Sequence, residues 1–185
     1  MREEREARIL AFLLALRSGA KGRYTLSREL GLGEGVLRGL TAEAAKRGYV
    51  QVGRGGTWLT REGLEELRRL LDKWHLVDAI LLEDVEAWGR KFRGVAAALD
   101  GRVRNVVEAR DEAVRAGAYM ALIIERGERG FTLPLVESYD LKSNVPQLHD
   151  ALVQLPLAPT YVVVLGEHIY PCVKGLLKLV SSAKV

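Results

Sequence analysis

The chain has 185 residues, of which 48% are hydrophobic and 28% are charged, and its formal net charge is +4. This composition is typical of a globular protein with a buried core, arranged as one domain or two small ones. No apolar run reaches the roughly 18 residues of a membrane span, the opening MREEREAR does not resemble a signal peptide, and a single cysteine excludes an intrachain disulfide, so a cytoplasmic protein without a membrane partner is predicted.

The excess positive charge is concentrated in the first part of the chain. Residues 1–75 hold 15 Lys and Arg against 10 Asp and Glu, a net of +5, whereas residues 76–185 hold 13 against 14, a net of −1. Neutralisation of nucleic-acid phosphates requires such an excess, although an ordinary solvated surface also explains it. The chain has 20 Arg, 8 Lys, two Asn and three Gln, which suggests a thermophilic source.

The first 75 residues predict four helices and a hairpin. Apolar residues recur at helical spacing in the segments expected to be helices, and apolar and polar residues alternate in the expected strands. Thr25 and Thr60 are the expected N-caps of the second and fourth helices, and Gly48 is expected to end the third. The helices are expected over residues 3–17, 25–30, 34–47 and 61–74, and the strands over residues 49–52 and 57–59.

Residues 24–60 have the order of parts of a winged helix-turn-helix. A short helix leads through a Gly31-Leu32-Gly33 turn to a second helix, and a two-stranded hairpin with Arg54 at its Gly-rich tip follows. In this motif one helix enters the major groove of DNA and the hairpin lies beside it. The sequence therefore predicts a winged-helix DNA-binding domain over residues 1–75, with double-stranded DNA as its partner.

The helix over residues 34–47 is expected to have a sparse outward face. Of the residues on that face, only Arg38 is suited to a bidentate contact with guanine, so modest base specificity and mainly phosphate-driven affinity are expected. Arg54 at the hairpin tip is expected to contact the minor groove or a phosphate. The predicted DNA-binding residues are Arg23, Thr25, Arg28, Arg38, Ala42, Lys46 and Arg54.

The pattern changes at Leu76, and a second domain is predicted over residues 76–185. The order β-β-α-β-β-α-β-α predicts a small two-layer α/β sandwich, so the whole chain is expected to be α+β. This domain is expected to form a homodimer or to bind a small-molecule effector, and the helix over residues 61–74 is a further candidate for pairing with its copy. Strands are expected over residues 77–82, 94–99, 119–125, 131–135 and 161–165, and helices over 105–116, 145–152 and 168–181.

Short motifs along most of the chain resemble one known family. They are the run Val107–Ala113 leading to Gly117-Ala118 and a strand, LGEGVLRGL at residues 32–40, and GGTWLTREG at residues 55–63. These motifs resemble an archaeal two-domain family in which a winged helix precedes a C-terminal domain of GAD-like fold and unknown function. The resemblance implies a transcription regulator whose C-terminal domain has no established ligand.

Arg110 is expected in the middle of an apolar helix face. A guanidinium in such a place needs a carboxylate, several carbonyls or a bound anion. A salt bridge to Glu167 or another acid, or an extension to the helix edge, is the favoured interpretation, and an effector pocket with Arg110 and Glu167 is the alternative. Asp111 and Arg115 are expected to pair on the exposed face. The apolar face is expected to comprise Val103, Val106, Val107, Ala113, Val114 and Gly117.

No catalytic, metal or cofactor site is predicted. His168 and Cys172 lie four residues apart on an expected helix, but nothing nearby completes a metal site, and Cys172 is interpreted as a core residue. The sequence has no P-loop, GxGxxG, GxSxG, HExxH or CxxC motif, and Glu83, Asp84 and Glu86 are interpreted as a solvated loop. A DNA-binding transcription regulator that is not an enzyme is therefore predicted. A protein-interaction module and a small-molecule enzyme with an accessory winged helix are the alternatives.

Overall fold

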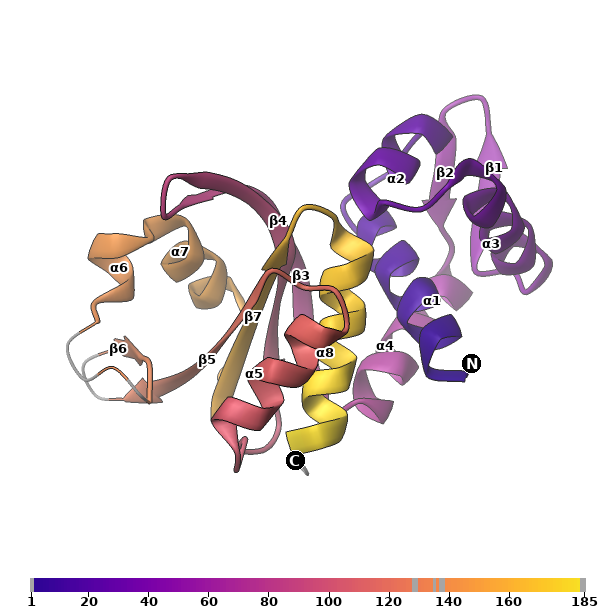
Figure 1. Ribbon diagram of the computed structural model, residues 1–185. Coiled ribbons are helices and arrows are strands. Elements are labelled where there is room, and N and C mark those ends of the chain that lie inside the picture. The colour runs from indigo at the N-terminus through magenta and orange to yellow at the C-terminus, as the bar shows by residue number, and fades with distance from the viewer. Residues whose placement is uncertain (1, 128–129, 135, 137–138, 184–185) are drawn as a thin grey trace.

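The computed structural model describes residues 2–127, 130–134, 136 and 139–183 of an α+β protein (Figure 1). None of the helices in these ranges has both the length and the apolar character needed to cross a bilayer. The elements are α1 (Arg2–Leu16), α2 (Arg23–Leu30), α3 (Glu34–Lys46), β1 (Val50–Gly53), β2 (Gly56–Leu59), α4 (Arg61–Lys73), β3 (Leu76–Ala87), β4 (Arg90–Leu99), α5 (Val106–Arg115), β5 (Met120–Gly127), β6 (Gly130–Thr132), α6 (Leu141–Asn144), α7 (Pro146–Gln154), β7 (Thr160–Gly166) and α8 (Ile169–Ala183).

The C-terminal half is built on an antiparallel sheet with the strand order β3-β4-β7-β5-β6. All seven residues of the central strand β7 are buried, so both of its faces need cover. Helices α5 and α8 cover one face, and α6 and α7 lie on the other (Figure 1). The predicted two-layer arrangement is therefore wrong, because alternate residues of β7, such as Val162 and Val163, belong to two separate hydrophobic clusters on opposite faces.

Strands β3 and β4 form a longer hairpin than the sequence pattern predicts. The register shifts between Leu82 and Val85, where Asp84 has a φ of 51°, so the acidic segment forms an irregularity within β3. Trp88 and Gly89, with φ of 50° and 73°, form the two-residue turn. The interpretation of Glu83, Asp84 and Glu86 as a loop is wrong, because all three lie within β3, where their side chains are exposed.

The helices and hairpin expected in the N-terminal half are present with similar bounds. The Thr60 hydroxyl accepts a hydrogen bond from the Gly63 amide at 3.0 Å, which confirms Thr60 as the N-cap of α4. Thr25 as the N-cap of α2 is wrong. This helix begins two residues earlier, and Gly22 is its cap, with an extended backbone and no side-chain hydrogen bond.

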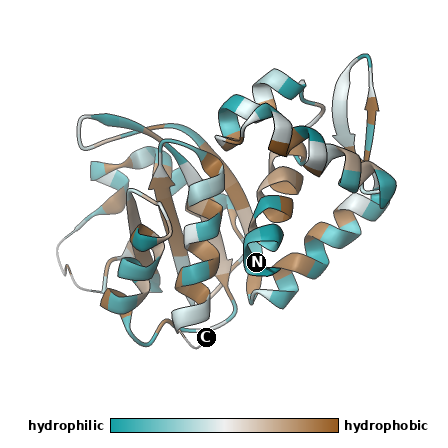
Figure 2. Ribbon diagram, turned by 45° about the vertical axis from the view of Figure 1, so that its right-hand side comes forward, coloured by the Kyte–Doolittle hydropathy of each residue, from teal (hydrophilic) through white to brown (hydrophobic). Residues whose placement is uncertain are grey.

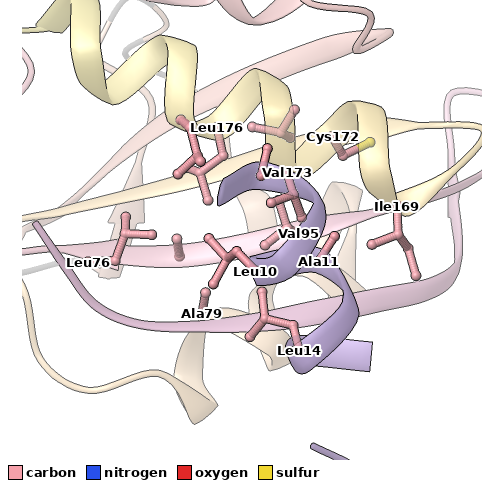
Figure 3. Packing of buried hydrophobic residues seen from close by; sticks show 14 of the residues in the cluster. Leu10, Ala11, Leu14, Leu76, Ala79, Val95, Ile169, Cys172, Val173 and Leu176 are labelled. Atoms are coloured by element: carbon pink, nitrogen blue, oxygen red, sulfur yellow. The ribbon is translucent and has the colours of Figure 1, made fainter. Parts of the chain in front are cut away.

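Helix α1 packs into both halves of the chain. Residues 10–16, the second half of α1, are all apolar and all buried, as expected where a helix is apolar on every side. Leu10 and Leu14 lie among residues of β3, β4 and α8, including Val95 and Val173 (Figure 3), and the same hydrophobic cluster extends to α2 and α3. Arg17, just beyond α1, binds both carboxylate oxygens of Asp78 in β3 at 2.6 and 2.9 Å. The two halves therefore share one continuous core.

The brown, hydrophobic segments in Figure 2 gather along the sheet and the helices next to it, whereas the helix surfaces turned to solvent carry most of the teal segments.

The boundary predicted between residues 75 and 76 falls in the turn between α4 and β3, where His75 has a φ of 54°. Helix α4 packs on the shared core through Leu67, Leu70 and Leu71, while Leu64 is 40% exposed.

Candidate nucleic-acid interface

Helices α2 and α3 and the β1-β2 hairpin lie together at the end of the molecule away from α6 and α7 (Figure 1). Gly31 ends α2 with a φ of 69°, and the Ser27 hydroxyl donates to the carbonyl of the buried Leu32 at 2.7 Å. A Cβ added at Gly31 would lie 2.5 Å from the Cβ of His168, which immediately precedes α8. The turn between α2 and α3 is therefore packed directly against the C-terminal half.

The outward face of α3 carries few long side chains. Leu37, Leu40 and Ala44 are buried, as predicted, so the opposite side of the helix is turned to solvent. A Cβ added at Gly35 or Gly39 would meet no atom within 4 Å, so packing within the chain does not require either glycine. The exposed residues of this face are Gly35, Arg38, Gly39, Ala42 and Lys46.

The hairpin is tied to the segment that precedes α2. Lys21 exchanges two backbone hydrogen bonds of 2.9 Å with Thr57 in β2. Gly56 has a φ of 108°, and a Cβ there would lie 2.6 Å from the Lys21 carbonyl oxygen, so a glycine is needed at this position. This attachment holds the base of the hairpin and leaves Arg54 exposed in the two-residue tip between Gly53 and Gly56.

The cations predicted to contact DNA are exposed and form no ion pair within the part of the chain that the structure describes. Within residues 2–75, most other Lys and Arg side chains pair with a carboxylate; examples are Arg5 and Arg47 with Glu43, and Arg69 with Glu66 at 2.6 Å. Thr25 is half-buried in the first turn of α2. Six exposed cations of residues 2–75 form no ion pair with any described residue, and they are Arg23, Arg28, Arg38, Lys46, Arg54 and Arg68.

Two further features of this surface were not predicted from the sequence. Tyr24 is 74% exposed, and the Arg28 guanidinium lies 5.9 Å from the centre of its ring. The spacing of four residues on α2 was the signal for this pair. Arg5 of α1 donates to Glu43 of α3 beside a groove of about 590 Å³ that Gly35 also lines. No local pattern indicates the second feature, because α1 and α3 are distant in the sequence.

Arg110 is exposed, so the expectation that it lies within a buried apolar helix face is wrong. Helix α5 packs on α8 through Ala109 and Ala113, and a Cβ added at Gly175 of α8 would lie 3.0 Å from the Ala113 carbonyl oxygen. The Nε of Arg110 donates to the Ala121 carbonyl at 3.0 Å. Close packing of small residues, rather than of the valines, therefore determines which side of α5 faces inward.

The expected ion pairs around α5 also differ from those in the structure. The Glu167 side chain is 91% exposed, and among the described residues its ion-pair partner is His168, at 4.0 Å, rather than Arg110. Arg115 pairs with Glu112 at 2.6 Å, so its expected pairing with Asp111 is wrong. The i, i+3 neighbour is used in place of the i, i+4 neighbour, and Asp111 has no ion pair within the part of the chain that the structure describes.

Cys172 is buried in the hydrophobic cluster between α8 and the sheet. Burial raises the pKa of its thiol to about 12, so it is protonated at neutral pH. Its Sγ lies 3.7 Å from the Arg93 carbonyl oxygen, and the adjacent turn residue His168 packs against Gly31. Across the described ranges, no group of three His, Cys, Asp or Glu side chains could hold a metal ion.

No protein-family model matches the chain, and no curated protein matches it. The solved structure of a hypothetical protein from Pyrococcus horikoshii OT3 is similar to it, with a TM-score of 0.73 and 21% sequence identity. The similarity covers 97% of this chain and 92% of the other chain. At this identity the comparison shows a shared fold over nearly the full length of both chains.

Proposed function

We propose that the chain is a winged-helix DNA-binding protein that regulates transcription. In this proposal α3 enters the major groove, and the β1-β2 hairpin reaches the adjacent backbone or minor groove. The observation that carries the proposal is a set of exposed cations on α2, α3 and the hairpin tip that form no ion pair with any described residue. They are Arg23, Arg28, Arg38, Lys46 and Arg54.

Charge supports this assignment because an exposed cation without a carboxylate partner is available to a phosphate. If Arg23, Arg28, Lys46 and Arg54 each neutralise one phosphate, the logarithm of the binding constant falls with the logarithm of salt concentration with a slope of about −3.6. Affinity for any duplex is then expected to fall roughly a hundredfold between about 50 and 200 mM salt. Such binding is largely independent of sequence.

The exposed face of α3, with glycines at positions 35 and 39, supports close contact with the DNA groove but offers few groups that read bases. Gly35, Gly39 and Ala42 bring the helix backbone near the base edges without a hydrogen-bonding side chain. Arg38 has five donors suited to guanine, and such a pair discriminates by about 1–3 kcal/mol. Arg38→Ala is therefore expected to reduce the preference at one base pair, whereas the affinity for other sequences changes less.

The proposal is tested by titrating random-sequence duplex DNA at two salt concentrations. Arg54→Ala is expected to weaken binding on all sequences and to make the salt slope shallower by about 1. The matched control is Arg68→Ala, which removes an exposed and unpaired arginine from α4, outside the proposed interface. Wild-type binding that does not depend on salt, or an equal loss in both variants, would contradict the docking arrangement.

The open space above Gly35 and Gly39 favours a second candidate, a protein-interaction module. A helix without side chains at these positions is also suited to close packing against a helix of another protein. This alternative predicts negligible affinity for duplex DNA at physiological salt and no effect of Arg54→Ala. The same titration therefore separates the two candidates.

A further inference from the structure

Helix α5 carries a stripe of four exposed residues, and the two charged ones form no ion pair with any residue that the structure describes. Val107, Arg110, Asp111 and Val114 have the spacing i, i+3, i+4 and i+7, which places them along one side of the helix. Val107 is 58% exposed and Val114 is 47% exposed. Arg110 and Asp111 are exposed and form no ion pair with any residue that the structure describes. Two apolar side chains thus flank two opposite and unpaired charges.

The order of these residues is self-complementary about a two-fold axis. When two copies of α5 lie antiparallel with the axis between positions 110 and 111, Val107 of one copy faces Val114 of the other. In the same register Arg110 faces Asp111 of the second copy, and both contacts occur twice. A two-fold interface requires such reciprocity, because each residue on one side meets its complement on the other.

We propose that the exposed face of α5 is a self-association surface that binds a second copy of this chain in an antiparallel arrangement. The Arg110 Nε is held by the Ala121 carbonyl, so the guanidinium is already oriented, and its Nη atoms donate no hydrogen bond to a described residue. They are therefore available for the Asp111 carboxylate of the second copy. The valines at the two ends of the stripe exclude water from these ion pairs.

A shallow apolar groove beside the stripe enlarges this surface. Its volume is about 110 Å³, well below the roughly 300 Å³ at which small-molecule pockets begin, which favours an inserted side chain over a free effector. Because a seam of one helix is small, we expect a dissociation constant in the micromolar range. The groove is lined by Val106, Arg110, Leu122, Ile123, Leu133, Pro134 and Val136.

Charge reversal on the full chain tests the pairing, with sedimentation equilibrium as the measurement. Arg110→Asp and Asp111→Arg each place like charges opposite one another and are expected to weaken the dimer about tenfold or more. The double variant restores opposite charges across the seam and is expected to recover dimerisation. The control Arg68→Asp makes the same charge change on α4 and is expected to leave the dimer intact.

Three results would overturn the proposal. They are a wild-type chain that stays monomeric at the highest soluble concentration, a dimer that neither reversal weakens, and a double variant that dimerises no better than the single ones. Loss of the hydrogen bond to Ala121 does not explain a recovery, because Arg110→Asp removes that bond in both the single and the double variant. A fold defect would likewise persist in the double variant. DNA binding is not measured, so the result does not depend on the proposed function.

The register is tested separately by cross-linking. In a chain with both Val107→Cys and Val114→Cys, each new thiol faces its complement in the second copy, and mild oxidation is expected to form a covalent dimer. The two positions are about 10 Å apart along one helix, too far for a disulfide within the chain. Val107→Cys alone is expected to stay unlinked, and equal cross-linking of the single variant would overturn the antiparallel register.

Discussion

Because α1 packs into both halves, truncation of one of its side chains is expected to destabilise the whole molecule. Leu10 is fully buried between β3, β4 and α8 (Figure 3). The change Leu10→Ala removes three carbon groups worth about 0.8 kcal/mol each, or about 2.4 kcal/mol together, and the cavity left behind brings the loss to about 3–4 kcal/mol. For a chain of this size the melting temperature should fall by about 10 °C.

The assay follows urea unfolding with a separate fluorescent reporter in each half. Trp58 and Trp74 lie in the N-terminal half, whereas Trp88 lies in the turn between β3 and β4. Trp88→Phe leaves Trp58 and Trp74 as reporters of the N-terminal half. Combining Trp58→Phe with Trp74→Phe leaves Trp88 as the reporter of the C-terminal half. We expect both backgrounds to show one transition with the same midpoint, and Leu10→Ala should shift the two midpoints by the same amount.

The control is Leu148→Ala in α7, which is also fully buried but belongs to the cluster on the opposite face of the sheet. If the halves unfold together, this change shifts the N-terminal reporters as well, although it lies far from them. The reasoning would be refuted if the two reporters showed separate unfolding transitions and Leu10→Ala shifted only the transition of the N-terminal half. The core around α1 would then be insufficient to couple the halves.

Two further predictions concern contacts that hold the N-terminal half in place. Burial alone would raise the pKa of Asp78, but its hydrogen bonds from Arg17 and from the Ala79 amide outweigh this, so the pKa lies below its ordinary value. A carboxyl group with a lowered pKa stabilises the folded state at pH values above its ordinary pKa of 3.8, and this stabilisation is lost as the pH falls through the pKa of the folded state. In urea unfolding, Asp78→Asn should therefore lower the free energy of unfolding by about 1–2 kcal/mol at pH 7 and by progressively less toward pH 3. Gly56→Ala should lower stability by about 1–3 kcal/mol in thermal unfolding, because of its positive φ and the close Lys21 carbonyl, whereas Gly55→Ala, which meets no atom within 4 Å, should change it little.

Much of the secondary structure follows from local pattern. Leu37, Leu40 and Ala44 predict the buried face of α3, and Thr60 predicts the start of α4, because side-chain spacing and capping chemistry act over a few residues. The all-apolar strand at residues 161–165 also indicates burial of β7. The exposed positions of Arg38 and Arg54 follow from the same local rules, since they lie opposite a buried face or at a hairpin tip.

The remaining features depend on tertiary packing that a local pattern does not contain. The valines of α5 suggested the inward face, but Ala109 and Ala113 allow the close approach to Gly175 that determines it. The same error led to the expectation that Arg110 lies on that inward face. Likewise, the apolar composition of α7 indicates a buried side without specifying which face of the sheet it covers. Ion pairing of Arg5 with Glu43 depends on the crossing of α1 and α3, so the sequence alone does not identify the cations that remain free.

The shared core links the two proposals through geometry. Helix α1, the Arg17–Asp78 pair and the contact of Gly31 with His168 hold α3 in a fixed position relative to the sheet. Helix α5 is fixed to the same sheet through α8, so a dimer formed through α5 would hold its two α3 helices at one separation. Because two-fold related recognition helices bind half-sites at a matching spacing, these packing contacts would set the spacing of the DNA sequence that the proposed dimer binds. Rotation of the N-terminal half relative to the sheet would break the buried contacts of α1. We therefore expect the DNA affinity of the proposed dimer to depend sharply on the spacing of the two half-sites.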